Sequence, residues 1–230
     1  MNIRHIKMLV EAGEGFEIEF KRKVSSPEKI ARTLCAFANT DGGTILFGVD
    51  DDGTMVGVDS EKTEIDQIRE AGEVHCFPPV PLHVSFVPYR HRDIIAVTVD
   101  KSDRKPHAVH IPGGTPSVYI RVEDNSVIAS KEVIKVLKDE VSQKELVLAI
   151  GGNERTLFDY LEQYHRITVQ EFAELVNVSR RRASRILTTL VRAGVIRIHT
   201  LERSDFFTLA SNDVQSVNTR ITQSRMLRKH

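Results

Sequence analysis

Apolar and polar positions at the start of the chain predict one strand and then one helix. Residues 14–24 alternate apolar and charged side chains, which is the period of a half-buried strand. Two serines, Pro27 and Glu28 then form a typical helix start, with a cap, a proline at the first helical position and an acid in the first turn. Apolar residues follow at helical spacing up to Ala38. Residues 1–10 mix apolar with basic side chains and fit either a short helix or a strand.

Residues 36–58 predict a helix end, a strand and a tight hairpin. Gly42 and Gly43 suit the helix end because glycine adopts the left-handed backbone conformation without strain. Residues 44–49 are β-branched and aromatic, as expected of a buried strand. Asp52-Gly53 is a strong hairpin signal before a returning strand up to Val58.

The next segments complete an expected N-terminal domain. The pattern predicts a polar helix at residues 60–74, strands at 82–87, 94–99 and 117–122, and a long helix at 130–150. Gly151 and Gly152 suit a helix stop and a flexible joint, so we place a domain boundary after residue 150. Residues 1–150 are therefore expected to form an α+β domain with helices packed on a mixed sheet.

The pattern after residue 150 changes to consecutive helices. The expected helices span residues 154–165, 168–177 and 180–193, and the expected strands span 195–200 and 206–209. Three helices with a short turn between the second and third, followed by a hairpin, resemble the winged helix-turn-helix of transcription regulators. Residues 151–210 are the expected second domain, and the polar residues 211–230 are expected to form a mobile tail.

Charge is distributed unevenly, although the chain as a whole has no net charge. Residues 151–230 carry 13 Lys and Arg against 8 Asp and Glu, whereas residues 1–150 carry 19 against 24. This asymmetry favours a nucleic-acid-facing module joined to one with another role.

Cys35 and Cys76 are too few for a disulfide framework and are expected to be buried free thiols. Since no signal peptide or membrane-spanning apolar run is visible, we expect a cytoplasmic protein without membrane contact.

Several segments resemble the Schlafen-type AlbA-like domain. The similar residues are Glu-Phe-Lys at 19–21, AFAN-T-x-GG-T-x-L-x-GV-DDDG at 36–53, and Tyr-Ile-Arg-Val at 119–122 before a polar turn. Glu123 stands where the family commonly has glycine. The resemblance covers about 120 to 130 residues, the size of a typical single domain. It implies a module found in prokaryotic transcriptional regulators and in animal Schlafen proteins.

The third helix of the second domain carries the candidate DNA-binding residues. Ser179 has the position of a cap, and arginines crowd the first two turns, the part of a recognition helix that enters the major groove. Arginine contacts guanine edges or phosphates and keeps its charge near neutral pH. The candidates on the helix are Arg180, Arg181, Arg182 and Arg185, and those on the expected wing are Arg197, His199 and Arg203. The alternative is a solvated basic helix face.

The resemblance also implies a second kind of site. In animal Schlafen proteins the related domain cleaves RNA with three carboxylates, which by motif position correspond to Glu14, Glu19 and Asp51. Three carboxylates can hold Mg²⁺ or Mn²⁺, which activates water and stabilises charge on a phosphate. Glutamates on a strand and aspartates in a turn are more often structural or solvated. The zinc ligands of Schlafen proteins are not visible as a set, so we expect no other metal site.

We interpret the sequence as a two-domain DNA-binding transcriptional regulator. The expected partner is double-stranded DNA, with RNA as a further ligand, and a homodimer is expected because paired recognition helices gain specificity. The N-terminal domain is expected to serve dimerisation, sensing or extra nucleic-acid contact, without a cofactor. Two alternatives stay open: a metal-dependent endoribonuclease using Glu14, Glu19 and Asp51, and a winged helix that binds only proteins.

Overall fold

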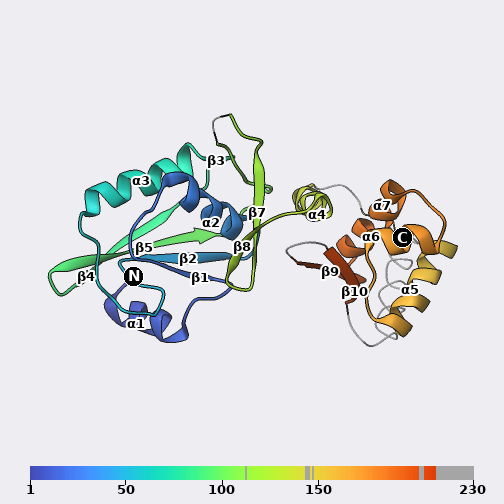
Figure 1. The fold of residues 1–230 in the computed structure, drawn as a ribbon, viewed down its shortest axis with the longest axis horizontal. Helices are drawn as coiled ribbons and strands as arrows, with labels where there is room; N and C mark the ends of the chain where they lie inside the picture. Colours follow the sequence, from blue (N-terminus) through green and yellow to red (C-terminus); the bar gives the residue numbers. More distant parts are fainter. Residues whose placement is uncertain (112, 143–145, 147, 202–204, 211–230) are drawn as a thin grey trace, which may run out of the picture. The chain divides into compact units, whose positions relative to one another are not determined.

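The computed structural model describes the chain except residues 112, 143–145, 147, 202–204 and 211–230. The chain divides into two compact units, Met1–Ala129 and Ser130–His230, and Figure 1 labels most of their elements. The division therefore lies earlier than the boundary expected after residue 150. The expected tail, residues 211–230, lies outside the described residues.

The N-terminal unit is built on a four-stranded mixed sheet in the order β1-β2-β5-β4. Its strands are β1 Ile18–Lys21, β2 Gly42–Phe47, β4 His83–Tyr89 and β5 Arg92–Asp100. β1 and β2 run parallel, and the other neighbours are antiparallel. The expected mixed sheet and the strand pair at 82–87 and 94–99 are confirmed, whereas the strand expected at 14–24 is limited to β1.

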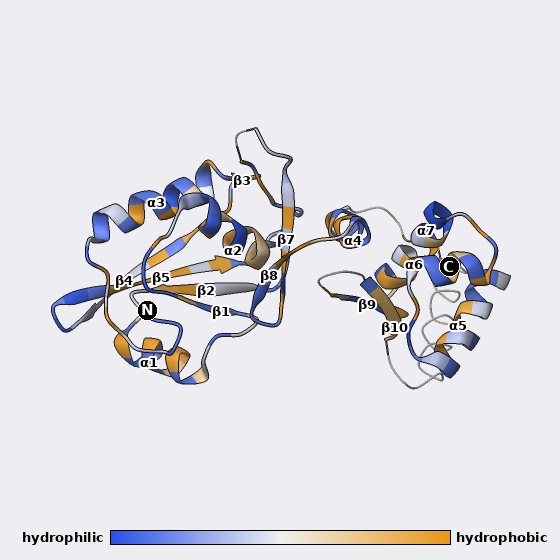
Figure 2. Ribbon diagram, in the orientation of Figure 1, coloured by the Kyte–Doolittle hydropathy of each residue, from blue (hydrophilic) through white to orange (hydrophobic). Residues whose placement is uncertain are grey.

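Alternate residues of the central strands enter two different cores, one on each face of the sheet. Ile45 and Phe47 join the core that includes α2 (Pro27–Asn39) and α3 (Glu61–Glu73). Leu46 joins the core that includes Ile6 of α1 (Ile3–Ala12), so the open question at residues 1–10 is decided as a helix. Because both faces are covered, each central strand carries an uninterrupted apolar run, at residues 45–47 of β2 and 94–97 of β5. Figure 2 shows apolar stretches on β5 and a largely hydrophilic α3.

A second, antiparallel sheet packs against α2. Its order is β3-β6-β7-β8, and its strands are β3 Cys76–Phe77, β6 Ala108–Val109, β7 Ser117–Val122 and β8 Asn125–Ile128. Every α2 residue from Thr33 to Asn39 is buried, and the helix contacts β7 as well as β2 and β5. The C-terminal half of α2 therefore has no solvent-facing side.

The hairpin expected over residues 44–58 is wrong as a strand pair. The tight turn at Asp52-Gly53 is present, and the Asp50 N–H donates to the Thr54 carbonyl oxygen at 2.9 Å. Both edges of β2 itself are occupied by β1 and β5, so the returning segment meets only the residues after β2, at the isolated bridge between Val49 and Met55. The backbone then crosses itself so closely that a Cβ on Gly48 would lie 2.8 Å from the Gly57 Cα. The returning segment therefore cannot pair with β2 itself, and glycine is required where the two backbones touch.

Gly42 and Gly43 begin β2 and do not end α2. Thr40 ends the helix, and its hydroxyl donates to the Ala36 carbonyl oxygen at 2.7 Å. Gly42 has the expected positive φ of 87°, and a Cβ there would lie 2.7 Å from the Val99 carbonyl oxygen. The close approach of β5 therefore requires the glycine at this position, not the end of the helix.

In its described residues, the C-terminal unit contains helices followed by a two-stranded antiparallel sheet. The elements are α4 Lys131–Val141, α5 Gly152–Tyr164, α6 Val169–Leu175, α7 Arg180–Arg192, β9 Ile196–Thr200 and β10 Asp205–Leu209. Ile167 and Phe207 exchange two backbone hydrogen bonds of 3.0 and 2.8 Å, so the segment before α6 also pairs with β10. One core joins α5, α6, α7 and the two strands, and it includes Leu157, Phe172, Leu187 and Phe207.

The helix expected over residues 130–150 ends at Val141 and packs within the second unit. Ser130 donates a hydrogen bond to Asp205 of β10. Lys135 Nζ donates to Thr188 Oγ1 of α7 at 2.7 Å. Both hydrogen bonds join α4 to residues much later in the sequence. They attach α4 to the second unit and explain why the boundary between the units lies before this helix.

The glycines expected to end that helix begin the next one. Gly151 is the N-cap residue of α5, and Glu154 Oε2 accepts a hydrogen bond from its N–H at 2.8 Å. Glycine is well tolerated at this position because it needs no helical backbone angles. The helices expected at 154–165, 168–177 and 180–193 are confirmed, with ends that differ by at most two residues. In the described parts of the chain, no helix has the length and apolarity needed to cross a membrane.

Candidate nucleic-acid interface

The first turn of α7 concentrates cations at a helix end that already carries partial positive charge. Ser179 is the N-cap, and its hydroxyl accepts from the Arg182 N–H at 3.3 Å. Arg180, Arg181 and Arg182 are exposed, and no acidic residue occupies this turn. Charges at helix ends change stability by about 0.3–1 kcal/mol each, and cations are unfavourable at the N-terminus. A bound anion would interact favourably with both the arginines and the free N–H groups.

α7 separates a core face from a charged face. Ala183, Leu187 and Leu190 are buried in the core of the unit. Arg181 and Arg185 are exposed and lie four residues apart, so they are neighbours on the outer face. The predicted arginines therefore lie together on the accessible N-terminal half of the helix.

A cavity of about 1000 Å³ lies between α4 and the start of α7. Its charged lining consists of Lys131, Glu132 and Lys135 from α4 and Arg180, Arg181, Arg182 and Arg185 from α7. Cations therefore outnumber carboxylates strongly in this lining. Sequence reasoning missed the two lysines, because only the packing of α4 on α7 brings them to this place.

These arginines differ from Arg22 and Arg92 of the N-terminal unit, which pair with carboxylates. Arg22 Nη1 lies 3.0 and 3.2 Å from the two carboxylate oxygens of Asp50. Arg92 lies 2.6 Å from Asp59. Within the part of the chain that the structure describes, no ion pair involves the four arginines at the start of α7. Their charge is therefore not compensated there by the protein itself.

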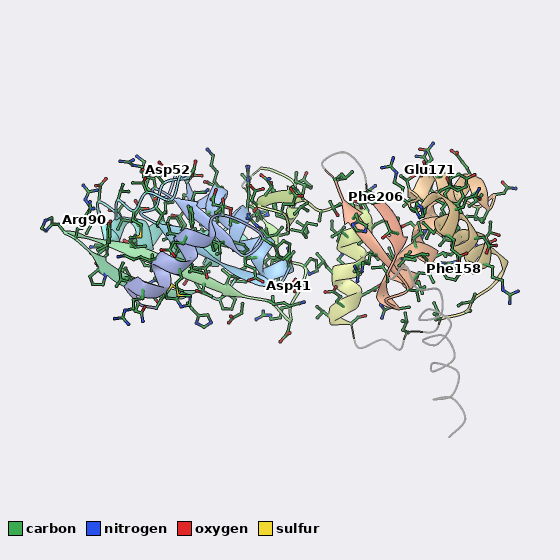
Figure 3. All side chains as sticks on the ribbon, turned by 90° about the horizontal axis from the view of Figure 1, so that it is seen from below. Asp41, Asp52, Arg90, Phe158, Glu171 and Phe206 are labelled. Atoms are coloured by element: carbon green, nitrogen blue, oxygen red, sulfur yellow. The ribbon has the colours of Figure 1, made fainter. Side chains whose placement is uncertain are left out.

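The hairpin of β9 and β10 carries the other predicted contacts. Arg197 is exposed on β9. His199 stacks on Phe206, labelled in Figure 3, with ring centroids 4.8 Å apart, and its Nε2 lies 2.9 Å from Thr208 Oγ1. These contacts give His199 a role in joining the two strands. Arg203 lies outside the described residues.

The three carboxylates of the nuclease alternative occupy different settings. Glu14 Oε1 accepts from the Phe20 N–H at 2.7 Å, and Asp51 is exposed in the turn after β2. Glu19 is largely buried and is paired with cations, as described next. Among the described residues, no group of three or more His, Cys, Asp or Glu side chains is arranged to hold a metal ion. The structure therefore does not gather these three into one site.

Arg121 joins β7 to β1 and was missed as a key residue by sequence reasoning. Its side chain is fully buried, and Nη1 donates to Glu19 Oε2 at 2.8 Å while Nη2 donates to the Gly15 carbonyl oxygen at 2.7 Å. Lys21 Nζ lies 2.7 Å from the other carboxylate oxygen of Glu19. The guanidinium also lies over the Phe37 ring, 4.9 Å from its centre. An arginine inside an otherwise apolar strand was the available signal.

Asn39 fixes the end of α2 to the second sheet. Its amide donates to the His107 and Tyr119 carbonyl oxygens, both at 2.8 Å, and accepts from the His107 N–H at 2.7 Å. The His107 ring is also enclosed, with Nδ1 2.7 Å from the Pro78 carbonyl oxygen. A carbonyl oxygen can only accept, so Nδ1 carries the proton. Burial disfavours the charged imidazole and lowers the pKa of His107.

The segment that contains Arg121 and Asn39 also decides the family. Residues 14–130 match the Schlafen, AlbA_2 family, which is just over half of the chain. The chain belongs to the Schlafen AlbA_2 family. The predicted resemblance is therefore confirmed for this segment. The arginines of α7 lie beyond the matched AlbA_2 domain.

Two solved structures are similar to this AlbA_2 protein. The N-terminal domain of a RecG-related protein from Nitrosomonas europaea, solved by NMR, is 22% identical with a TM-score of 0.43; the match covers 63% of this chain and 94% of that one. The crystal structure of a Corynebacterium diphtheriae protein is 12% identical with a TM-score of 0.47; the match covers 98% of this chain and 53% of that one. This chain thus spans about half the length of the Corynebacterium protein.

The cysteines of the AlbA_2 domain are free and buried, as predicted. Their sulfur atoms lie 3.3 Å apart, Cys35 on α2 and Cys76 on β3. The hydrogen bond to Cys76, together with burial, raises the pKa of the Cys35 thiol. Cys35 is therefore protonated at neutral pH, which makes it a poor nucleophile.

Proposed function

We propose that this AlbA_2 protein is a DNA-binding transcriptional regulator whose C-terminal unit is a winged helix-turn-helix. The observation that carries the proposal is the group of exposed arginines at the start of α7, for which the described residues offer no carboxylate partner. In this proposal α7 is the recognition helix, and Arg181 and Arg185 reach base edges or phosphates in the major groove.

The connection between α6 and α7 supports the helix-turn-helix part of the proposal. α6 ends at Leu175 and α7 begins at Arg180, so the turn is short. Asn177 adopts a left-handed conformation with φ 51°, and the Val178 N–H donates to the Ala173 carbonyl oxygen at 2.9 Å. This hydrogen bond fixes the turn and sets the direction in which α7 leaves it.

The hairpin supports the wing. β9 follows α7 directly, and the antiparallel pair is held to the core by Phe207. Arg197 extends from this pair into solvent and can reach a phosphate beside the groove. Arg203 is proposed to act in the same way.

The AlbA_2 domain is proposed to contribute dimerisation, sensing or an extra nucleic-acid contact. Its basic residues Arg22 and Arg92 are paired with carboxylates, which makes it a weaker candidate for the main DNA contact. A homodimer would place two copies of α7 on successive half-sites of one duplex. This arrangement is the usual way in which short recognition helices gain specificity.

The double variant Arg181→Ala with Arg185→Ala tests the proposal. We expect weaker duplex binding and a slope of log K against log salt that is smaller by about 0.9 for each phosphate that the protein no longer neutralises. Fluorescence anisotropy of a labelled duplex at several salt concentrations measures both quantities. Arg155→Ala with Arg166→Ala removes the same charge from exposed positions outside the cavity and is the matched control. Unchanged affinity and slope in the α7 variant, with its fold intact by circular dichroism, would remove this site.

A further inference from the structure

We propose that α4 forms the second wall of a phosphate-binding cleft, in which Lys131 and Lys135 hold successive phosphates of one nucleic-acid backbone beside the arginines of α7. This inference rests on the proposed function and deepens it, because it assigns a role to a helix outside the helix-turn-helix. The expected ligand is a chain of phosphodiesters, bound without regard to base sequence.

The first support is where α4 crosses α7. Arg181, Arg185, Thr188 and Arg192 follow at spacings of four, three and four, so they lie on one face of α7. Lys135 of α4 donates to Thr188 at 2.7 Å, and Asp139 of α4 lies 3.9 Å from Arg192. α4 therefore covers the C-terminal half of this face and leaves the N-terminal half open as the cavity.

The second support is the width of the groove. The major groove is about 12 Å wide and admits one helix, whose diameter with side chains is about 10–12 Å. α4 packs on the outer face of α7, so both helices cannot enter one groove together. With α7 seated in the groove, α4 lies at its border, where the phosphates are. Lys131 and Lys135 then meet backbone oxygens and not base edges.

The third support is the chemistry of the lining. Lysine is a compact point charge suited to phosphate, whereas arginine also reads base edges, and the cavity places lysines on one wall and arginines on the other. Lys131 is exposed, and Lys135 is held in place by its hydrogen bond to Thr188. Glu132 is the only carboxylate among the lining residues that the structure describes. A cavity of about 1000 Å³ accommodates one phosphate-bearing strand beside α7.

The test compares Lys131→Gln with Lys135→Gln against the control Lys138→Gln in the full chain. Lys138 lies on the same helix and is exposed but does not line the cavity. We expect the cleft variant to bind specific and random duplexes on the order of tenfold more weakly at 0.1 M salt, with a slope smaller by about 1 for each lysine. The control keeps the wild-type affinity and slope. Lys131→Gln alone, which breaks no hydrogen bond given by the structure, is expected to show half of the slope change.

Two measurements separate a failure of the cleft from a failure of the proposed function: duplex binding by the variants, and tripolyphosphate binding. If Arg181→Ala with Arg185→Ala weakens DNA binding but the lysine variant binds as wild type or more tightly, the phosphate-binding role of α4 is wrong. The proposed DNA-binding function of α7 is then still supported. If the wild type binds no duplex, the proposed function fails, and calorimetry with tripolyphosphate decides on the cleft. Tripolyphosphate binding that is abolished in the lysine variant and kept in Lys138→Gln supports Lys131 and Lys135 as a site for linked phosphates, and binding that the lysine variant keeps overturns the cleft. No tripolyphosphate binding by the wild type then overturns it.

Discussion

Arg121 is a buried cation whose partners come from distant parts of the chain. Glu19 and Gly15 precede it by 102 and 106 positions, and its Nε has no hydrogen-bond partner among the described residues. A buried guanidinium is tolerated only where opposite charge and acceptors surround it, because desolvation of an ion is costly. The pair with Glu19 therefore fixes β7 against β1 with a single geometry.

Arg121→Gln is expected to lower the free energy of unfolding of the AlbA_2 domain by about 3 kcal/mol or more, because Glu19 stays largely buried without one of its two cationic partners. Urea unfolding followed by circular dichroism measures the change. Arg69→Gln, at an exposed position on α3, is the control and is expected to lie within about 0.5 kcal/mol of wild type. A loss below about 1 kcal/mol in Arg121→Gln would show that the ion pair is not stabilising.

The same pairing affects how the nuclease alternative must be tested. Glu19→Gln removes a carboxylate that Arg121 and Lys21 both contact, so the absence of RNA cleavage in this variant would also follow from a damaged fold. Asp51→Asn is the cleaner substitution, because Asp51 is exposed. Thermal unfolding of each variant separates the two explanations.

At the scale of single elements, helix starts are local events with local causes. Ser26, Ser60, Ser130, Thr168 and Ser179 each accept a hydrogen bond from the backbone N–H three residues later. A cap and the apolar spacing after it lie within one short stretch of sequence, so both can be read without knowledge of the fold. This is why α2, α3 and α7 are found where the pattern predicts them.

Ser179 allows the stability of α7 to be separated from its charge. Ser179→Ala is expected to lower the free energy of unfolding of the C-terminal unit by about 1 kcal/mol, because alanine cannot cap the Arg182 N–H. Ser179→Asp keeps the cap and the stability but adds a carboxylate beside the arginines, so duplex binding is expected to weaken. Thermal melts and anisotropy titrations on the same two proteins measure both effects. Equal duplex binding by Ser179→Asp and wild type would contradict the proposed interface.

Strands, in contrast, are decided by partners elsewhere in the chain. β2 has the composition of a hairpin arm, yet its neighbours are β1 and β5, so the returning segment at residues 54–58 bonds to the residues after β2 and not to the strand itself. Gly42 has the positive φ that the sequence predicts, and Gly48 has one as well. Whether such a glycine ends a helix or lets two backbones touch depends on what packs against it.

For the whole molecule, the position of α4 changes the domain assignment. Residues 131–141 continue the sequence pattern of the first unit without an obvious break, but Ser130 and Lys135 bind groups that lie 75 and 53 positions later. The proposed DNA-binding unit therefore begins before α4 and includes it. The uneven charge of the two halves agrees with this separation of roles.

The proposed homodimer is a prediction at the same scale. Light scattering after size exclusion is expected to give about twice the chain mass of 26.0 kDa. A duplex with two half-sites about 10–10.5 base pairs apart is expected to bind one dimer, because two recognition helices then face the same side of the DNA. A chain that stays monomeric at micromolar concentration and binds such a duplex one-to-one would rule out this arrangement.

The sequence by itself determined the family segment, the starts of α2, α3 and α7 and the arginines at the start of α7, because each is carried by a short local pattern. Only the tertiary structure decided the partners of β2, the burial of Arg121 with Glu19, the separation of the three carboxylates and the place of α4 beside α7. These depend on contacts between residues that are far apart in sequence. Their free energy comes from burial and pairing, which no local pattern encodes.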